Sequence, residues 1–401
     1  MDGQLRRHAR FVAALFLVSL ALRPQIIATA PLIPSIQSEL GISHTVAGLL
    51  GSIPVLCMGL FAPVAAYVAG WVGARWAIAA SVAMVAAGGL LRLAGPTTAV
   101  LILLTVPVGI GIAVAGTLMP AVVKSRLAHR PAFGTGIYAT GIQLGAAVSA
   151  ALAVPLAHLH GGWRFSLAIF SVAAAFSAGA WLALGGREGR SPLRVKPPKM
   201  PLRNPTAWQV SLVFAMIAVC FYGLSAWLPD AYVEHGWSEG KAGWLLALVQ
   251  AVTVPTGLLV PWLADRRGSR RFYLTTAAAV QMGGLLGVQL LPGAAWLWAV
   301  VLGMGIGTLF PLAMTLPLDL SHDPAAAGAV TGMMLGVGYT ITGFAPFVLG
   351  LVRDATGSFS ASLWLIVAIE GCLLVASTRL THERLHAHAQ PAAPVGGAAG
   401  R

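Results

Sequence analysis

Charged residues are scarce in this sequence, and acidic ones most of all. Only 9% of its 401 residues are Asp, Glu, Lys or Arg, while 57% are hydrophobic. A soluble globular chain carries about 25% charged residues. The composition therefore excludes a soluble globular protein and indicates a polytopic membrane protein whose main partner is the lipid bilayer.

Two further shortages exclude other kinds of site. Basic residues outnumber acidic ones by 25 to 12, but they are scattered between apolar runs and form no basic and aromatic patch of the kind that binds nucleic acid. The three cysteines, Cys57, Cys220 and Cys372, lie in apolar runs and lack the spacing of a metal site. We expect no nucleic-acid partner, no disulfide framework, no metal and no cofactor, and we expect the cysteines to be small core residues.

Apolar runs long enough to cross a bilayer, about 20 residues each, fill the sequence. The first could also be a cleaved signal peptide, because Arg6, Arg7 and Arg10 precede it, but Arg23 and Pro24 interrupt it. A first membrane helix fits better. The twelve expected spans are residues 11–36, 45–70, 76–94, 98–123, 132–157, 164–184, 206–230, 242–264, 272–291, 294–317, 326–351 and 360–379.

The distribution of Lys and Arg predicts the orientation of these spans. With a cytoplasmic N-terminus, only Arg92, Arg164, Lys241 and Arg353 fall on the opposite side of the membrane. Cytoplasmic loops of membrane proteins carry such an excess of basic residues. We therefore expect a multi-pass protein of the cell inner membrane with both termini in the cytoplasm, since an odd number of spans would scramble the pattern.

The sequence also contains an internal duplication. Residues 70–75 (GWVGAR) align with 261–266 (PWLADR), and residues 116–120 (GTLMP) align with 307–311 (GTLFP), at the same offset along the chain. Two matches at one offset indicate a duplicated six-helix unit. Transporters built from such repeats bind their substrate between the copies, near the middle of the bilayer.

Two polar segments complete the expected domain organisation. Residues 185–205 are rich in Pro, Lys and Arg, which is typical of an extended linker, and the last residues are of low complexity. The expected parts are an N-terminal six-helix bundle at 1–184, a cytoplasmic linker at 185–205, a C-terminal six-helix bundle at 206–386 and a disordered tail at 387–401.

A permanent charge in the middle of the first span is the main functional signal. Arg23 lies about twelve residues, or roughly 18 Å, from either end of that span. An Arg at the centre of a membrane helix costs about 2.5–3.5 kcal/mol, so it faces a cavity or a partner. A guanidinium binds carboxylate-like or linear anions through paired hydrogen bonds. We expect an anionic substrate; the alternative is a structural Arg that snorkels or pairs with a backbone carbonyl.

Several of these motifs resemble a known family. Residues 265–271 (DRRGSRR) resemble the signature loop of the major facilitator superfamily, although Ala74 replaces the Asp of that motif in the first copy. More narrowly, the sequence resembles the cyanate/2-nitroimidazole transporter family at Arg23-Pro24, Met119-Pro120 with Lys124 and Arg126, residues 226–234 (AWLPDAYVE) and Leu318-Asp319. The resemblance implies an all-α membrane protein with twelve transmembrane helices in two six-helix bundles around a central cavity.

The resemblance also assigns roles to individual residues. The expected substrate-binding residues are Arg23, Gln25, Thr117, Tyr138, Gln143, Phe221, Tyr222 and Tyr339, each of which could instead make a helix contact. Gating roles are expected for Asp265, Arg266 and Arg75. Proton coupling would need a carboxylate, for which Glu370 and Asp319 are the candidates. Uniport and anion exchange are the alternatives to coupling with protons.

We thus expect a monomeric secondary active transporter, not an enzyme, that moves a small anion or anion-like solute by alternating access. The solute would resemble cyanate, a nitroimidazole or a small carboxylate. A broad-specificity drug exporter of the same fold is the alternative. A membrane metalloprotease is a distant third, because residues 382–386 (HERLH) match the H-E-x-x-H zinc motif, but they follow the last span and no third ligand is evident.

Overall fold

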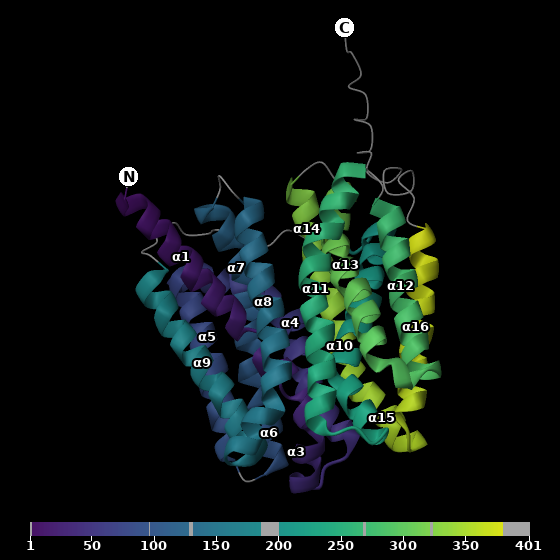
Figure 1. The fold of residues 1–401 in the computed structure, drawn as a ribbon. Helices are drawn as coiled ribbons and strands as arrows, with labels where there is room; N and C mark the ends of the chain where they lie inside the picture. Colours follow the sequence, from purple (N-terminus) through teal and green to yellow (C-terminus); the bar gives the residue numbers. More distant parts are fainter. Residues whose placement is uncertain are drawn as a thin grey trace.

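The computed structural model describes residues 2–95, 97–127, 131–185, 200–267, 270–320 and 324–379. Within these residues every regular element is a helix (Figure 1). The first half contains α1 (Asp2–Ala21), α2 (Pro24–Ile27), η1 (Ala30–Leu32), α3 (Ile33–Leu40), α4 (His44–Val72), α5 (Ala74–Ala94), α6 (Thr98–Leu103), α7 (Thr105–Arg126), α8 (Pro131–Leu159) and α9 (Gly162–Leu184). The second half contains α10 (Pro205–Glu234), α11 (Glu239–Arg267), α12 (Arg270–Leu290), η2 (Pro292–Ala294), α13 (Ala295–Leu320), α14 (Pro324–Gly343), α15 (Ala345–Thr356) and α16 (Phe359–Arg379).

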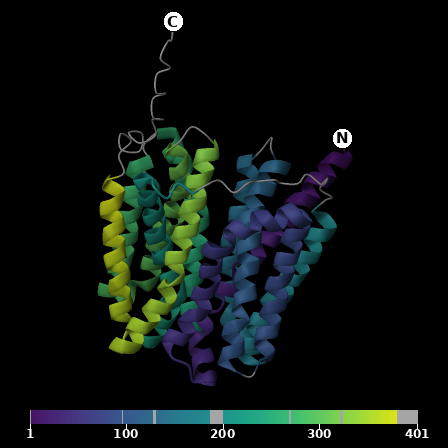
Figure 2. The ribbon, with the colours of Figure 1, turned by 180° about the vertical axis from the view of Figure 1, so that it is seen from behind.

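The helices of the two halves lie on opposite sides of the molecule (Figures 1 and 2). The halves pack against each other along two lines, α4 against α14 and α15, and α8 against α11. We call the face at which α1 begins the N-terminal face, and the face at which α4 begins the His44 face. The long helices run between these two faces, so a path between the halves would cross the protein.

Eleven helical segments of the described residues are long and apolar enough to cross a membrane. The protein is therefore a multi-pass membrane protein. The ninth expected span is also a helix, α12, but it is not among the eleven. Tyr273, Gln281 and Gln289 lower its mean hydropathy.

The first span is broken at Pro24, inside the run that the sequence predicted as one membrane span. Helix α1 ends at Ala21 and α2 begins at Pro24, because proline has no backbone N–H to continue the helix. The freed carbonyl of Leu20 lies so close to Gly145 on α8 that a Cβ there would collide with it. The break leaves Arg23 between two helical segments, the arrangement from which transporters of this kind build binding sites.

The expected segment boundaries can be compared only in part. Helix α9 ends at Leu184, and α10 begins at Pro205 with the Asn204 side chain as its cap. Most of the expected linker at 185–205, the tail at 387–401 and the motif at 382–386 lie outside the described residues. The core prediction holds for two cysteines, which are buried, but it was wrong for Cys372, which is exposed on α16.

Candidate functional site

A cavity of about 750 Å³ lies between the two halves. It extends from Arg23 in the interior to helix ends at the N-terminal face, where Ala121 on α7 and Met314 on α13 line it. Its walls come from α4, α7, α8, α10, α11, α13 and α14, and most of the lining is apolar. The cavity is thus a mid-protein chamber with its approach on one face.

The two copies of the duplicated motif contribute matching walls. Residues 116–120 lie on α7 and residues 307–311 on α13. Gly116, Thr117 and Pro120 line the cavity from the first half, and Gly307, Phe310 and Pro311 line it from the second. Glycine at such positions lets neighbouring helices approach closely, and proline favours a bend in the helix.

Arg23 lies at the inner end of the cavity and is only 8% exposed. Its Nη1 atom donates a hydrogen bond to the hydroxyl of Tyr222, and its guanidinium carbon lies 5.6 Å and 5.3 Å from the ring centroids of Phe221 and Tyr222. No carboxylate of the described residues lies within 4 Å of it. The charge is therefore held by a neutral hydroxyl and two aromatic faces.

Five of the other expected binding residues share this cavity with Arg23: Thr117, Tyr138, Gln143, Phe221 and Tyr339. The Tyr138 hydroxyl donates to the Gly116 carbonyl at 3.2 Å, and the Gln143 amide donates to Thr253 in the other half. Throughout the described chain, nothing is hydrogen-bonded to the Tyr339 hydroxyl. Tyr222 lies under the floor of the cavity and lines a small void on its far side.

Gln25 is the expected binding residue that the structure does not bring to the cavity. It is fully buried, and its amide nitrogen donates to Ser171 on α9 at 2.9 Å. Its amide oxygen accepts from the Arg92 Nη2 atom on α5 at 2.6 Å. Helix geometry explains the difference, because residues two apart in a helix do not face the same side, so Gln25 points away from the side on which Arg23 lies.

Arg92 was expected at the membrane surface and is buried in the first half, with 1% of its surface exposed. Besides Gln25, its other close partner is the hydroxyl of Thr105, at 3.4 Å. The sequence did not predict this burial, because Arg92 lies near the end of an apolar run, where an arginine usually reaches the surface. A long side chain there can also reach back into the core.

The expected gating residues are placed in part. Arg75 on α5 donates to the Leu182 carbonyl on α9 and lies over the Trp76 ring, so the contacts seen are within the first half. Arg266 is exposed on α11 and lies 3.9 Å from the centroid of the Trp262 ring. The side chain of Asp265 lies outside the described part of the structure.

Glu370, one of the two expected coupling carboxylates, lies away from the cavity. Glu370 on α16 is buried against α12, where it accepts from the Gln281 amide at 3.1 Å, and it is not among the cavity-lining residues. The side chain of Asp319 falls outside the described residues.

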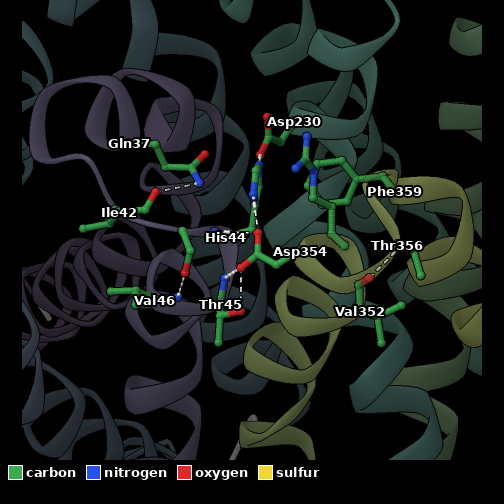
Figure 3. Close-up of polar contacts among 12 residues, drawn as sticks. Gln37, Ile42, His44, Thr45, Val46, Asp230, Val352, Asp354, Thr356 and Phe359 are labelled. Atoms are coloured by element: carbon green, nitrogen blue, oxygen red, sulfur yellow. Dashed lines mark hydrogen bonds and ion pairs between the residues drawn. The ribbon is translucent and has the colours of Figure 1, made fainter.

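At the His44 face, one carboxylate of the second half caps a helix of the first (Figure 3). Asp354 on α15 accepts from the backbone N–H groups of His44 and Thr45 at 3.2 and 2.8 Å, and from the Thr45 hydroxyl at 2.6 Å. The first N–H groups of a helix lack partners within the helix, and a carboxylate there is stabilised by the helix dipole. The cap therefore ties α4 to α15 and closes this face.

The His44 ring adds a second tie to the same contact. Its Nδ1 atom lies 2.8 Å from Asp354, and its Nε2 atom lies 3.6 Å from Asp230 on α10. These residues were not among the expected sites, because Asp354 lies 310 residues from His44 and no local pattern joins them. The sequence could have predicted only that a helix begins here, because Ser43 is a typical N-cap residue. In the structure its side chain accepts a hydrogen bond from the Val46 N–H.

Close backbone packing completes the closed face. A Cβ atom on Gly48 of α4 would lie 2.5 Å from the Pro346 carbonyl oxygen on α15, and one on Gly350 would collide with the His44 carbonyl. Small residues allow such close approach between membrane helices. The cavity is therefore shut on the His44 face and approached from the N-terminal face.

Comparison with known proteins agrees with this geometry. The Major Facilitator Superfamily profile matches residues 15–346. The cyanate transport protein CynX of Escherichia coli is 34% identical over 86% of this chain and 90% of its own length, and the 2-nitroimidazole transporter of the same organism is 30% identical over 88% and 90%. A solved bacterial homologue of the human lysosomal transporter Spinster, in an inward-facing and unoccupied conformation, superposes with a TM-score of 0.79 at 17% identity, covering 97% of this chain and 99% of that one.

Proposed function

Because the chain belongs to the major facilitator superfamily, we propose that it is a secondary active transporter that moves a small anion across the membrane by alternating access. The family and its relatives are transporters, so the protein is a transporter and not an enzyme. The resemblance to cyanate and nitroimidazole transporters is confirmed at the level of the family. The substrate and the mechanism are argued below.

The observation that carries the proposal is the isolated charge of Arg23 at the end of the cavity. A buried ionised group is costly unless it is paired, and Arg23 has a hydroxyl and aromatic rings but no described carboxylate beside it. An anion in the cavity would supply the missing charge. Tyr339, whose hydroxyl has no hydrogen-bond partner in the described part of the chain, would donate a further hydrogen bond.

The size and shape of the anion follow from the same site. The guanidinium has a planar fork of donors that matches carboxylate-like and linear anions. Phe221 and Tyr222 cover part of it, so a small anion such as cyanate or a short carboxylate fits better than a branched polyanion. The names of the two relatives agree with a solute of this class.

The transport cycle would exchange the two faces. With the His44 face shut by Asp354 and the cavity approached from the N-terminal face, the chain adopts one of the two states that alternating access needs. We infer that α12 also crosses the membrane, as the ninth span along the chain, since it packs between α13 and α16. This brings the number of spans to twelve. The two six-helix bundles, residues 1–184 and 206–386, would then rock about the cavity, with residues 185–205 joining them.

The positive-inside pattern supports a cytoplasmic location of the N-terminal face. We therefore propose that both termini are cytoplasmic, that the protein lies in the inner membrane as a monomer, and that the observed state faces the cytoplasm. Glu370 lies away from the cavity and is hydrogen-bonded to Gln281, so its position does not support a role in coupling transport to protons.

A drug exporter is the second candidate, and the size of the cavity favours it. A chamber of about 750 Å³ is within the range that holds drug-sized molecules, about 300–1,000 Å³. Such a protein would bind large neutral compounds and would be indifferent to the charge of its substrate. The charge at Arg23 argues for the anion transporter.

Flux into proteoliposomes tests the proposal. Wild-type protein should catalyse exchange of labelled cyanate or acetate and should not exchange acetamide, the neutral counterpart of acetate. Arg23→Ala should abolish the exchange, whereas Arg10→Ala, a change at an exposed residue of α1, should leave it unchanged. Equal exchange of acetate and acetamide, or full activity in Arg23→Ala, would favour the exporter.

A further inference from the structure

We propose that His44 and Asp230 share one proton when the His44 face is closed, so that closing this face takes up a proton from solution. The site is distinct from the cavity and has no counterpart among the expected coupling residues. Its consequence for transport rests on the proposed function, but the proton itself is argued from the contacts in Figure 3.

The contacts of Asp354 determine which nitrogen of His44 carries a hydrogen. The carboxylate already accepts hydrogen bonds from two backbone N–H groups and from the Thr45 hydroxyl, and an ionised carboxylate can only accept. The Nδ1 atom of His44, 2.8 Å from the Asp354 Oδ1 atom, must therefore be the donor.

This assignment leaves the other nitrogen facing a second acceptor. The Nε2 atom of His44 points at the Oδ2 atom of Asp230, 3.6 Å away, and that oxygen is buried with no hydrogen-bond partner among the described residues. In a neutral ring with hydrogen on Nδ1, Nε2 carries only a lone pair. Two acceptors then face each other, unless a proton lies on Nε2 or on Asp230. Either placement gives the pair one bound proton.

Burial favours a bound proton at Asp230, because its side chain is only 6% exposed and its Oδ2 atom has no hydrogen-bond partner among the described residues, and an unpaired buried charge is costly. Besides Asp230 and Asp354, the carboxylates of Glu234 and Glu239 lie in the same cluster, and Arg353, 3.4 Å from Glu234, is the cation opposing them. Like charges close together favour protonation of one of them.

Two aromatic rings pack against His44, and Glu239 has a hydrogen-bond partner of its own. The rings of Trp227 and Phe359 pack against the imidazole with centroids 5.8 and 5.4 Å away. The Glu239 carboxylate accepts from the Ser35 hydroxyl at 2.7 Å, so it has its own partner on α3. The proton site therefore lies between α4, α10, α15 and α16, where aromatic rings exclude part of the water.

Opening the face would take the site apart. His44 belongs to the first half, while Asp230 and Asp354 belong to the second, so separation of α4 from α10 and α15 exposes each group to water. Above about pH 6.5, where a histidine exposed to water has lost its proton, the closed state then holds one proton more than the open state. By linkage, lowering the pH in this range favours the closed state and raising it favours the open one. Because the site lies at the His44 face, the pH on that side controls the direction in which the cavity faces.

The test measures the distance across the His44 face as the pH changes. Spin labels at Ser38→Cys on α3 and Ala355→Cys on α15, both exposed, report whether the face is open, in full-length protein in nanodiscs with Cys372→Ser as background. Between about pH 8 and about pH 5.5, a range that includes the titration of histidine, the ratio of closed to open protein should rise by up to about tenfold per unit of pH decrease.

Two variants and one control make the assignment specific. In Asp230→Asn the amide can donate to Nε2 without a proton, so the closed state should dominate at every pH. In His44→Gln the pH dependence should be lost. Glu39→Gln changes a carboxylate of the same face that pairs with Arg164 inside the first half, and it should keep the wild-type dependence. Each of the first two variants removes one side of the shared site, so either one that folds is sufficient.

A wild-type ratio that does not change with pH, or a wild-type dependence that persists in either Asp230→Asn or His44→Gln, overturns the proposal. The experiment contains no substrate. A failure of the anion proposal at Arg23 therefore leaves this result unaffected, and a failure here leaves the Arg23 test unaffected.

Discussion

The guanidinium of Arg23 donates a hydrogen bond to the hydroxyl of Tyr222, which lies 199 residues further along the chain, in the other half of the protein. The bond joins the broken first span to α10 at the floor of the cavity. It aims the charge at the cavity without neutralising it, because a phenol hydroxyl is uncharged. The predictions below test what this contact and its surroundings do.

Tyr222→Phe should weaken anion binding by roughly tenfold or more, the effect of losing one hydrogen bond made by a charged group. The ring that packs on Arg23 is kept, and only the hydroxyl that orients the guanidinium is lost. Isothermal titration of purified protein with acetate measures the change. An affinity equal to wild type would mean that the bond does not position Arg23.

Tyr339→Phe should lower anion affinity by a similar factor, since the hydroxyl has no other partner in the described structure and lines the cavity with Arg23. The aromatic contacts with Phe214 and Tyr222 are retained, so the fold should tolerate the change. The matched control is Tyr273→Phe, a tyrosine on α12 outside the cavity. Equal affinities for wild type and Tyr339→Phe would show that the hydroxyl does not contact the substrate.

Gln25→Leu should destabilise the protein and spare its binding site. The change removes the acceptor of the Arg92 Nη2 atom, at 2.6 Å, and leaves a buried charged donor unpaired, at a cost of about 1–3 kcal/mol. The thermal midpoint in detergent should fall, while the affinity of the folded fraction for acetate should stay near wild type. A normal midpoint with lost binding would restore Gln25 to the substrate site.

Gly48→Ala should shift the protein toward the state that is open at the His44 face. The added Cβ would lie 2.5 Å from the Pro346 carbonyl oxygen, whereas at Gly51 the nearest atom, Pro346 Cβ, would lie at 3.4 Å. Gly51→Ala is therefore the control. The distance between spin labels at Ser38→Cys and Ala355→Cys should increase in Gly48→Ala alone, and equal distances in both variants would contradict the closed geometry.

Much of the fold could be predicted from the sequence, because length and hydropathy of the runs determine membrane helices. The exceptions have local causes. Helix α12 is less apolar because of Gln281 and Gln289, and the first span breaks before Pro24 although its hydropathy is continuous. Hydropathy measures transfer into lipid and carries no information on where a backbone bond is lost.

The site could be predicted where the signal was a charge in an apolar run, as at Arg23. It could not be predicted where the signal is a contact between distant residues. Gln25 and Arg92 form a hydrogen bond across 67 residues of sequence, and the Asp354 cap on α4 joins residues 310 apart. Neither contact leaves a pattern in the sequence near it.

The measurement that tests the account most directly is the binding of acetate and of its neutral counterpart, acetamide, to purified wild-type, Arg23→Gln and Arg10→Gln protein. The account predicts that wild type and Arg10→Gln bind acetate with equal affinity and bind acetamide far more weakly. Arg23→Gln should bind acetate roughly 10- to 100-fold more weakly, the loss expected for a hydrogen bond to a charged group. Unchanged acetate affinity in Arg23→Gln would contradict the central claim that this one charge holds the substrate.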